Sequence, residues 1–146
     1  MGLFSRKSSV DENSEKFYEH IRKTEEKKIT NALNQNDFDT VLLIGEKLTK
    51  TYPQCSYGWE TMGDAYINLD KYEDAIRCFE QSNSMQTPNL FLNYLQLGIA
   101  YEGAEKIAMA IKQYELCLNL DPNDSHGKHD FLIGSISFLK NKLDVN

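Results

Sequence analysis

The residues with the clearest capacity for chemistry are two histidines in the C-terminal part of the sequence. His126 and His129 stand three residues apart, with Asp124 and Asp130 close by. Imidazole nitrogens and carboxylate oxygens bind zinc, and this spacing would place both histidines on one helix face. A zinc site needs three or four protein ligands, and no further ligand occurs at a suitable spacing. The sequence therefore predicts no metal site, and a histidine-dependent metal hydrolase is the last of the alternatives.

Cysteine chemistry is not indicated either. Cys55, Cys78 and Cys117 are odd in number, lie far apart and form no CxxC pair, so neither a disulfide framework nor a thiolate zinc site is predicted. The sequence also lacks a glycine-rich phosphate loop, a GxSxG elbow and an HExxH motif. We therefore expect no catalytic residues and no cofactor, and the cysteine pattern favours a reducing, cytoplasmic location.

The charge distribution bears on the partners that the chain could bind. Of its 146 residues, 1–28 carry 7 Lys or Arg against 6 Asp or Glu, whereas 29–146 carry 9 against 16. An acidic body argues against nucleic acid as a partner, because nucleic acid binding needs a basic surface that displaces counterions from phosphates. No run of about 18 apolar residues occurs, so neither a membrane-spanning helix nor contact with a membrane is expected.

Residues 1–13 are predicted to form a flexible tail. They lack the apolar stretch of a secretory signal, and residues 5–14 contain almost nothing that could be buried. The first residues come close to the acylation pattern M-G-x-x-x-[ST], but Arg6 occupies the position that requires a hydroxyl group. A solvated tail is therefore expected in preference to an acylated one.

A repeated pattern organises the rest of the chain. The segment WETMGDAY at 59–66, followed by Ala75 and Phe79, corresponds at an offset of 35 residues to YLQLGIAY at 94–101, followed by Ala110 and Tyr114. Residues 38–53 fit the same template about one repeat earlier, as a degenerate copy. A proline follows the second helix of each copy. Such a period indicates stacked supersecondary units.

This pattern resembles the tetratricopeptide repeat, whose signature is W-x2-L-G-x2-Y, then A-x3-F, then P. The resemblance implies an all-α fold, a right-handed superhelical array of about three helix-turn-helix repeats with a C-terminal capping helix. It implies a single domain over 14–146. Its repeats are expected near residues 22–55, 56–90 and 91–124, and its capping helix near 125–142.

Two glycines within the predicted helices require a physical reason. Gly63 and Gly98 each cost about 1 kcal/mol relative to alanine inside a helix. We expect the missing side chain to allow close approach of Ala75 or Ala110 on the paired helix, with aromatic rings filling the space beside it. Thr87-Pro88 and Asp121-Pro122 are expected either to begin the next helix or to stop the preceding one.

The resemblance also implies a binding groove, because the first helices of such repeats line a concave surface that holds a peptide or a helix. By repeat register the groove residues are expected to be Tyr57, Glu60, Asp64, Asn68, Leu92, Leu95, Ile99 and Glu102. The basic clamp that some family members use for the carboxylate of a chaperone tail is absent here. Acidic walls would repel such a ligand and favour a basic one.

Two features of this groove stay open at the level of sequence. Leu92, Leu95 and Ile99 form an apolar stripe that is either covered by neighbouring helices or used to anchor a ligand. Phe17 and Ile21 precede a charged run, so that residues 14–28 either fold back over the groove or form a homodimer through this N-terminal arm.

The sequence therefore predicts a noncatalytic adaptor or scaffold that binds an apolar, partly basic peptide or helix of a protein partner. A dedicated assembly or secretion chaperone of the same fold is the alternative.

Overall fold

The computed structural model describes residues 12–145, and within this range it contains seven α-helices and no strand. The predicted all-α class is therefore confirmed. Residues 1–11, which hold most of the predicted tail and the incomplete acylation pattern, lie outside the described residues. The helices are α1 (Glu12–Asn34), α2 (Phe38–Thr51), α3 (Tyr57–Asn68), α4 (Tyr72–Ser84), α5 (Leu90–Gly103), α6 (Ile107–Leu120) and α7 (His129–Asp144).

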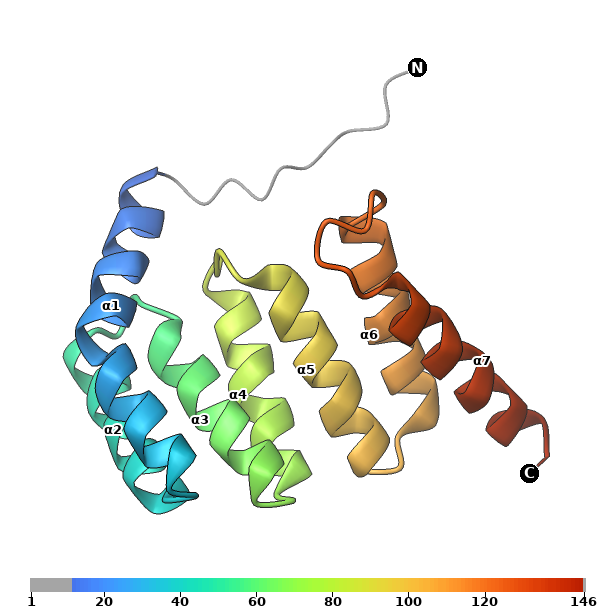
Figure 1. Cartoon of the computed structure of the whole chain (residues 1–146), viewed down its shortest axis with the longest axis horizontal. Helices are drawn as coiled ribbons and strands as arrows, with labels where there is room; N and C mark the ends of the chain where they lie inside the picture. Colours follow the sequence, from blue (N-terminus) through green and yellow to red (C-terminus); the bar gives the residue numbers. More distant parts are fainter. Residues whose placement is uncertain (1–11, 146) are drawn as a thin grey trace.

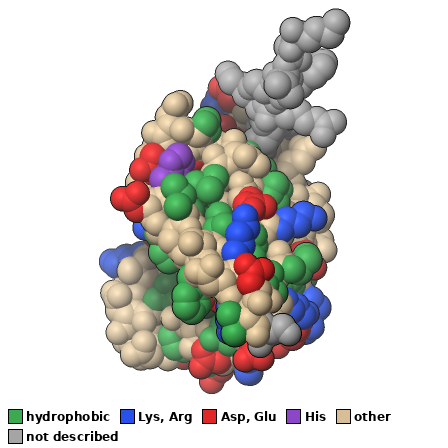
Figure 2. Space-filling model, turned by 90° about the vertical axis from the view of Figure 1, so that its right-hand side faces the viewer, with side chains coloured by type: hydrophobic (Ala, Val, Ile, Leu, Met, Phe, Trp, Pro, Cys, Tyr) green, Lys and Arg blue, Asp and Glu red, His purple; other side chains and the backbone are tan. Residues whose placement is uncertain are grey.

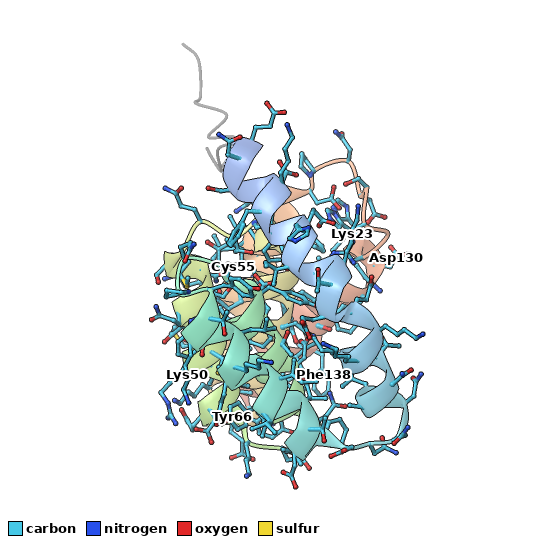
Figure 3. All side chains as sticks on the ribbon, turned by 90° about the vertical axis from the view of Figure 1, so that its left-hand side faces the viewer. Lys23, Lys50, Cys55, Tyr66, Asp130 and Phe138 are labelled. Carbon is cyan, nitrogen blue, oxygen red and sulfur yellow. The ribbon has the colours of Figure 1, made fainter. Side chains whose placement is uncertain are left out.

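The helices form an array of antiparallel pairs that follows the order of the sequence (Figure 1). It runs from α1 and α2 at one end, through α3 with α4 and α5 with α6, to α7 at the other end. Each helix packs on its neighbours in sequence, and α3 also packs on both α1 and α5. The first helices of successive pairs therefore lie side by side. Figure 3 looks along the array from its first pair, with Lys23 on the α1 side and Lys50 on the α2 side.

The turn inside each pair has the same backbone conformation. Asn36, Asp70 and Glu105 follow the first helix of their pairs, and each has a positive φ, between 54° and 59°. A left-handed residue at this point ends one helix and redirects the chain into the next. The first pair therefore shares the turn of the other two, although its sequence is the most degenerate of the three.

The core changes character along the array. From α4 to α7 one continuous cluster of buried side chains contains Phe79, Leu97, Tyr114 and Leu132. At the α1 end two smaller clusters replace it, one around Tyr18 and another formed by the buried side chains of Ile29, Ala32, Val41 and Ala65. The side chains of the first pair are therefore buried in smaller, separate apolar clusters, whereas the later helices share one continuous core.

The glycines of the repeat make room for rings. A Cβ atom added at Gly63 would lie 2.7 Å from the ring of Phe79, and one added at Gly98 would overlap the ring of Tyr114. The close neighbour is thus the ring on the paired helix, where the sequence had suggested an alanine. In α7 the corresponding position is Ile133, which is exposed, since no later helix described here packs on it.

Some helix limits differ from those expected. α1 begins at Glu12 instead of near residue 22, so residues 12 and 13 belong to this helix and not to the tail. α7 begins at His129 instead of near residue 125. Pro88 and Pro122 both lie in loops after the preceding helix, and neither occupies a first helical position. Proline therefore acts here as a stop.

The far end of the array carries apolar side chains on its outer surface. Figure 2 faces this end and shows apolar groups among charged and polar ones over α6 and α7. Phe131, Ile133 and Phe138 of α7 are each about half exposed or more, at 48%, 56% and 63%. None of the helices in residues 12–145 is both long enough and apolar enough to cross a membrane.

Candidate interaction groove

A groove of about 340 Å³ lies between the first helices of the three pairs, α1, α3 and α5. Its volume is at the lower end of the ~300–1,000 Å³ that ligand pockets usually have. It suits a few side chains of a partner better than a whole helix. The lining residues are Tyr18, Arg22, Glu26, Ile29, Thr30, Leu33, Val41, Tyr57, Glu60, Thr61, Asp64, Phe79, Asn89, Leu92, Asn93, Leu95 and Gln96.

α1 supplies one long wall of the groove. Its lining residues recur every three or four positions from Tyr18 to Leu33, which places them on a single face of the helix. Arg22 on this face is held by two ion pairs within α1, at 2.9 Å to Glu19 and 2.9 Å to Glu26. The positive charge of Arg22 is therefore balanced within its own helix, and it does not neutralise the opposite wall.

Glu60 forms the floor of the groove, where it is only 6% exposed. Its Oε1 atom accepts hydrogen bonds from the hydroxyl groups of Ser56 at 3.0 Å, Ser82 at 2.9 Å and Thr87 at 2.5 Å. The Asn93 side chain donates to the same oxygen at 3.4 Å, and Asn89 donates to Oε2 at 3.2 Å. The hydroxyl of Tyr18 also donates to Oε2.

These six donors are neutral, and they come from α1, α4, α5 and the loops that precede α3 and α5. A buried carboxylate is tolerated when its oxygens are fully hydrogen-bonded. Burial, followed by the charge of Glu60, raises the pKa of Tyr18 far above its usual range, so its hydroxyl stays protonated as a donor. Glu60 therefore connects the helices around the groove and is not a free acidic wall.

Asp64 lies one turn beyond Glu60 on α3 and is only partly exposed. Gln96 of α5 donates to its Oδ1 atom at 2.7 Å. Burial raises the pKa of Asp64 to about 6, and the charge of Glu60 adds to this, while the hydrogen bond from Gln96 acts in the opposite direction. Asp64 is thus a carboxylate held in a poorly solvated place without a cation among its hydrogen-bond partners, which is a suitable place for a basic group.

α5 supplies the apolar part of the opposite wall. Leu92 is 47% exposed and lines the groove, as does the half-buried Leu95. Leu95 and Ile99 also pack against the main core, and Ile99 does not reach the groove. The apolar stripe is therefore divided: neighbouring helices cover Ile99 and part of Leu95, whereas the side chain of Leu92 is exposed in the groove.

Five of the eight residues predicted from repeat register line this groove, namely Tyr57, Glu60, Asp64, Leu92 and Leu95. Asn68, Ile99 and Glu102 do not line it. Asn68 is exposed at the end of α3, where its side chain donates to the carbonyl of Asp64 at 2.8 Å. Glu102, near the end of α5, accepts a hydrogen bond from the hydroxyl of Tyr114 on the paired helix α6 at 3.0 Å.

The register did not identify several groove residues. Tyr18 and Arg22 were missed because the first repeat was expected to begin near residue 22, although Tyr18 and Ile21 have helical spacing with the residues that follow. Asn89 and Asn93 were missed because their role depends on Glu60, which lies about 30 residues away in sequence. Residues 14–28 form part of the groove wall, with Ile21 buried and Phe17 in edge contact with Tyr52 at 5.8 Å.

The polar loop before α7 brings together Asp121, Asp124 and His129, whose ligand atoms lie within 4.8 Å of one another. These atoms already have partners. Asp121 accepts hydrogen bonds from the backbone and side chains of Ser125 and His126 at 2.6 to 2.9 Å. Asp124 accepts two backbone N–H groups at the start of α7. The cluster caps the helix, which accounts for its geometry without a metal.

Comparison with known proteins agrees with the repeat. A tetratricopeptide repeat family model matches residues 57–88 and 93–124. The solved structures similar to this chain include the first TPR domain of human RPAP3, with 19% identity and a TM-score of 0.65 over 79% of this chain and 91% of that one. A double mutant of MamA RS-1 has 18% identity and a TM-score of 0.58 over 81% and 74%. No curated protein sequence matches significantly. These likenesses confirm the resemblance and the fold.

Proposed function

We propose that this chain, which contains tetratricopeptide repeats and therefore has the fold of a protein-interaction module, is a noncatalytic adaptor. It binds an apolar, partly basic segment of a protein partner in the groove between α1, α3 and α5. Tetratricopeptide arrays bind their partners on extended concave surfaces. The division into one domain over 14–146 with three repeats is part of this proposal.

The observation that supports it most directly is the pairing of Leu92 and Asp64 in one groove. Leu92 is a large apolar side chain with 47% of its surface exposed, although α5 is apolar on its other side as well. Asp64 is a carboxylate whose poor solvation raises its pKa. Exposure of the Leu92 side chain and poor solvation of the Asp64 carboxylate are both unfavourable in the free protein. A ligand with an apolar group next to a basic one would cover the first and pair with the second.

The charge of the lining favours the same ligand. Arg22 is the one cation among the lining residues, against Glu26, Glu60 and Asp64. A basic segment would be attracted and a carboxylate repelled. The ring of Tyr57 packs edge-on against Tyr18 at 5.5 Å and gives the groove a rigid aromatic side. Such a surface suits an arginine or lysine side chain, which combines an apolar stem with a charged end.

The experiment is affinity capture from the native host with three forms of the protein: wild type, Leu92→Glu and Leu43→Glu. Leu43 is 67% exposed on α2 and does not line the groove, so Leu43→Glu is a matched control. A partner that is retained by wild type and Leu43→Glu but lost with Leu92→Glu supports the proposal. Circular dichroism checks that all three forms are equally helical.

The captured partner then identifies the bound segment. A synthetic peptide of that segment should bind wild type at least about tenfold more tightly than Leu92→Glu, because burial of a leucine contributes about 1.5–3 kcal/mol. Equal binding by the two forms would refute the groove assignment. A partner that is insoluble alone and soluble only on coexpression would favour the chaperone alternative.

A further inference from the structure

We propose that the partner segment presents a lysine to the groove between α1, α3 and α5, and that the groove selects lysine over arginine. The ammonium group of this lysine lies between the carboxylates of Glu26 and Asp64 and the hydroxyl of Tyr57. An apolar residue of the same segment packs against Leu92. This inference rests on the proposed function, since it takes the same groove as the binding site and names the basic residue that the site recognises.

Asp64 has one carboxylate oxygen that a ligand can use. Gln96 of α5 donates to its Oδ1 atom at 2.7 Å, and no group within residues 12–145 donates to its Oδ2 atom. The amide of Gln96 is neutral, so the negative charge of Asp64 has no opposite charge beside it. Burial raises the pKa of Asp64 to about 6, which agrees with a poorly compensated charge. A cation at Oδ2 supplies the charge that Gln96 lacks.

Glu26 contributes a second oxygen, from α1. Its Oε1 atom accepts a hydrogen bond from Arg22 at 2.9 Å, and none of the described residues donates to its Oε2 atom. The guanidinium of Arg22 also donates to both carboxylate oxygens of Glu19, so its charge is shared between two carboxylates. The groove therefore offers two available oxygens, Oε2 of Glu26 and Oδ2 of Asp64, and they belong to different carboxylates on different helices.

The hydroxyl of Tyr57 is the third polar group of the site. Tyr57 begins α3 and lines the groove, and its hydroxyl has no hydrogen-bond partner in the part of the chain that the structure describes. Burial raises the pKa of Tyr57 to about 12, and the charge of Glu26 adds to this increase. Arg22 acts in the opposite direction, whereas Glu60 and Asp64 add smaller increases. The hydroxyl therefore lies within the field of both carboxylates, stays protonated and offers its oxygen to a cation.

These acceptors suit an ammonium group better than a guanidinium group. Lysine carries a compact charge with three N–H donors, which can point to separate oxygens. Arginine is planar and binds most strongly when two of its N–H groups donate to both oxygens of one carboxylate. Asp64 and Glu26 each use one oxygen for a bond within the protein, so neither has both oxygens available. The paired geometry that favours arginine is therefore absent from the described part of the groove.

The apolar part of the groove adjoins this site. Leu95 of α5 lines the groove and precedes Gln96, which bonds to Asp64, and the exposed Leu92 lies one turn earlier on the same helix. The apolar surface and the cation site are thus connected through one helix. A groove of about 340 Å³ accommodates only a few side chains. The ligand is therefore a short segment in which an apolar residue stands close in sequence to a lysine.

The test uses the full wild-type chain and three synthetic probes: a leucine-lysine-leucine tripeptide with blocked ends, and its counterparts with arginine or glutamine at the centre. Amide NMR titration gives the dissociation constants from the resonances of Asp64 and Gln96. The lysine peptide should bind about tenfold more tightly than either counterpart. An arginine peptide that binds as tightly as the lysine peptide overturns the inference. So does a lysine peptide that binds no more tightly than the glutamine peptide.

Charge-removing variants locate the ammonium group. Glu26→Gln and Asp64→Asn should each weaken binding of the lysine peptide about tenfold and leave the glutamine peptide unaffected. Glu25→Gln is the matched control, because Glu25 lies on α1 and pairs with Lys28 but does not line the groove. An unchanged affinity for the lysine peptide in Glu26→Gln or Asp64→Asn overturns the site. Partner capture with Leu92→Glu as the negative form does not depend on which basic residue the partner carries, so the proposed function stands when lysine selectivity alone fails.

Discussion

The hydroxyl group of Tyr18 donates a hydrogen bond to the carboxylate of Glu60, 42 residues further along the chain. Asn89 in turn donates to the Tyr18 oxygen. These bonds tie α1 to α3 and to the start of α5, across the groove that all three helices form. Two small apolar clusters also hold α1 at this end of the array, and the buried carboxylate with its donors adds a polar connection to them.

Replacing Tyr18 by phenylalanine should lower the free energy of unfolding by about 1.5–3 kcal/mol, the usual contribution of a hydrogen bond to a charged group. The ring stays, so its contact with Tyr57 is kept. Urea unfolding measures the change. Tyr72→Phe is the control, because the hydroxyl of Tyr72 bonds to Asp70 in an exposed place, and its loss should change the stability by less than about 0.5 kcal/mol. Equal effects would show that the Glu60 network does not secure α1.

The repeat register predicted the position of Glu60 correctly but not its role. The register put Glu60 on the inner side of α3, and the residue lies there. It could not show that Glu60 is buried, because all of its donors except Ser56 lie 22 or more residues away in sequence. An acidic residue at an inward position was therefore interpreted as an exposed wall, when it is an internal connection between helices.

The glycines of the repeat lead to a second prediction. Gly98→Ala should lower the free energy of unfolding by about 1–3 kcal/mol, because the new methyl group would overlap the ring of Tyr114, which is fully buried and cannot move away. Gly134→Ala should instead raise it by about 0.5–1 kcal/mol, since nothing lies near that position in α7 and alanine favours a helix. Thermal unfolding of the two variants would distinguish these signs. Stabilisation by both would mean that Gly98 has no packing role.

Here the sequence allowed more to be predicted. Recurrence of glycine at 35-residue spacing, together with a ring on the following helix, was enough to predict a close approach within each pair. The partner was a different atom from the one expected, because side-chain direction along a helix places the ring and not the alanine Cβ over the glycine. The start of α1 was not predicted, because the sequence there is mostly charged and shows little of the apolar periodicity from which a helix is recognised.

The polar loop before α7 gives a third prediction, about metal. The purified protein should contain less than about 0.1 equivalent of zinc, iron or manganese, because the carboxylates of Asp121 and Asp124 already accept hydrogen bonds from the loop. Chelation should leave the thermal midpoint unchanged. Asp121→Ala, in contrast, should lower the midpoint, since it removes the acceptor for Ser125 and His126. A midpoint that falls on chelation and recovers with zinc would establish a metal site.

Asp64 gives the last prediction, which concerns pH. Its pKa in the folded protein is about 6, above the ordinary value of 3.8. The folded state therefore binds the proton more tightly than the unfolded state, and the contribution of Asp64 to stability is lost as pH rises from about 4 to about 6. Asp64→Asn keeps the acceptor for Gln96 without the charge. It should be more stable than wild type by about 1–3 kcal/mol at pH 7 and equal to it below pH 4.

Gln96 provides a control on the cause. Its hydrogen bond lowers the pKa of Asp64, so Gln96→Ala should raise that pKa further and move the difference between wild type and Asp64→Asn to higher pH. An NMR titration of the Asp64 carboxyl carbon follows the same change directly. A pKa near 4 in both backgrounds would contradict the poor solvation on which the ligand preference rests. If the pKa of Asp64 is near 6 and falls when a basic peptide binds, the peptide forms an ion pair that compensates for the poor solvation of the Asp64 carboxylate.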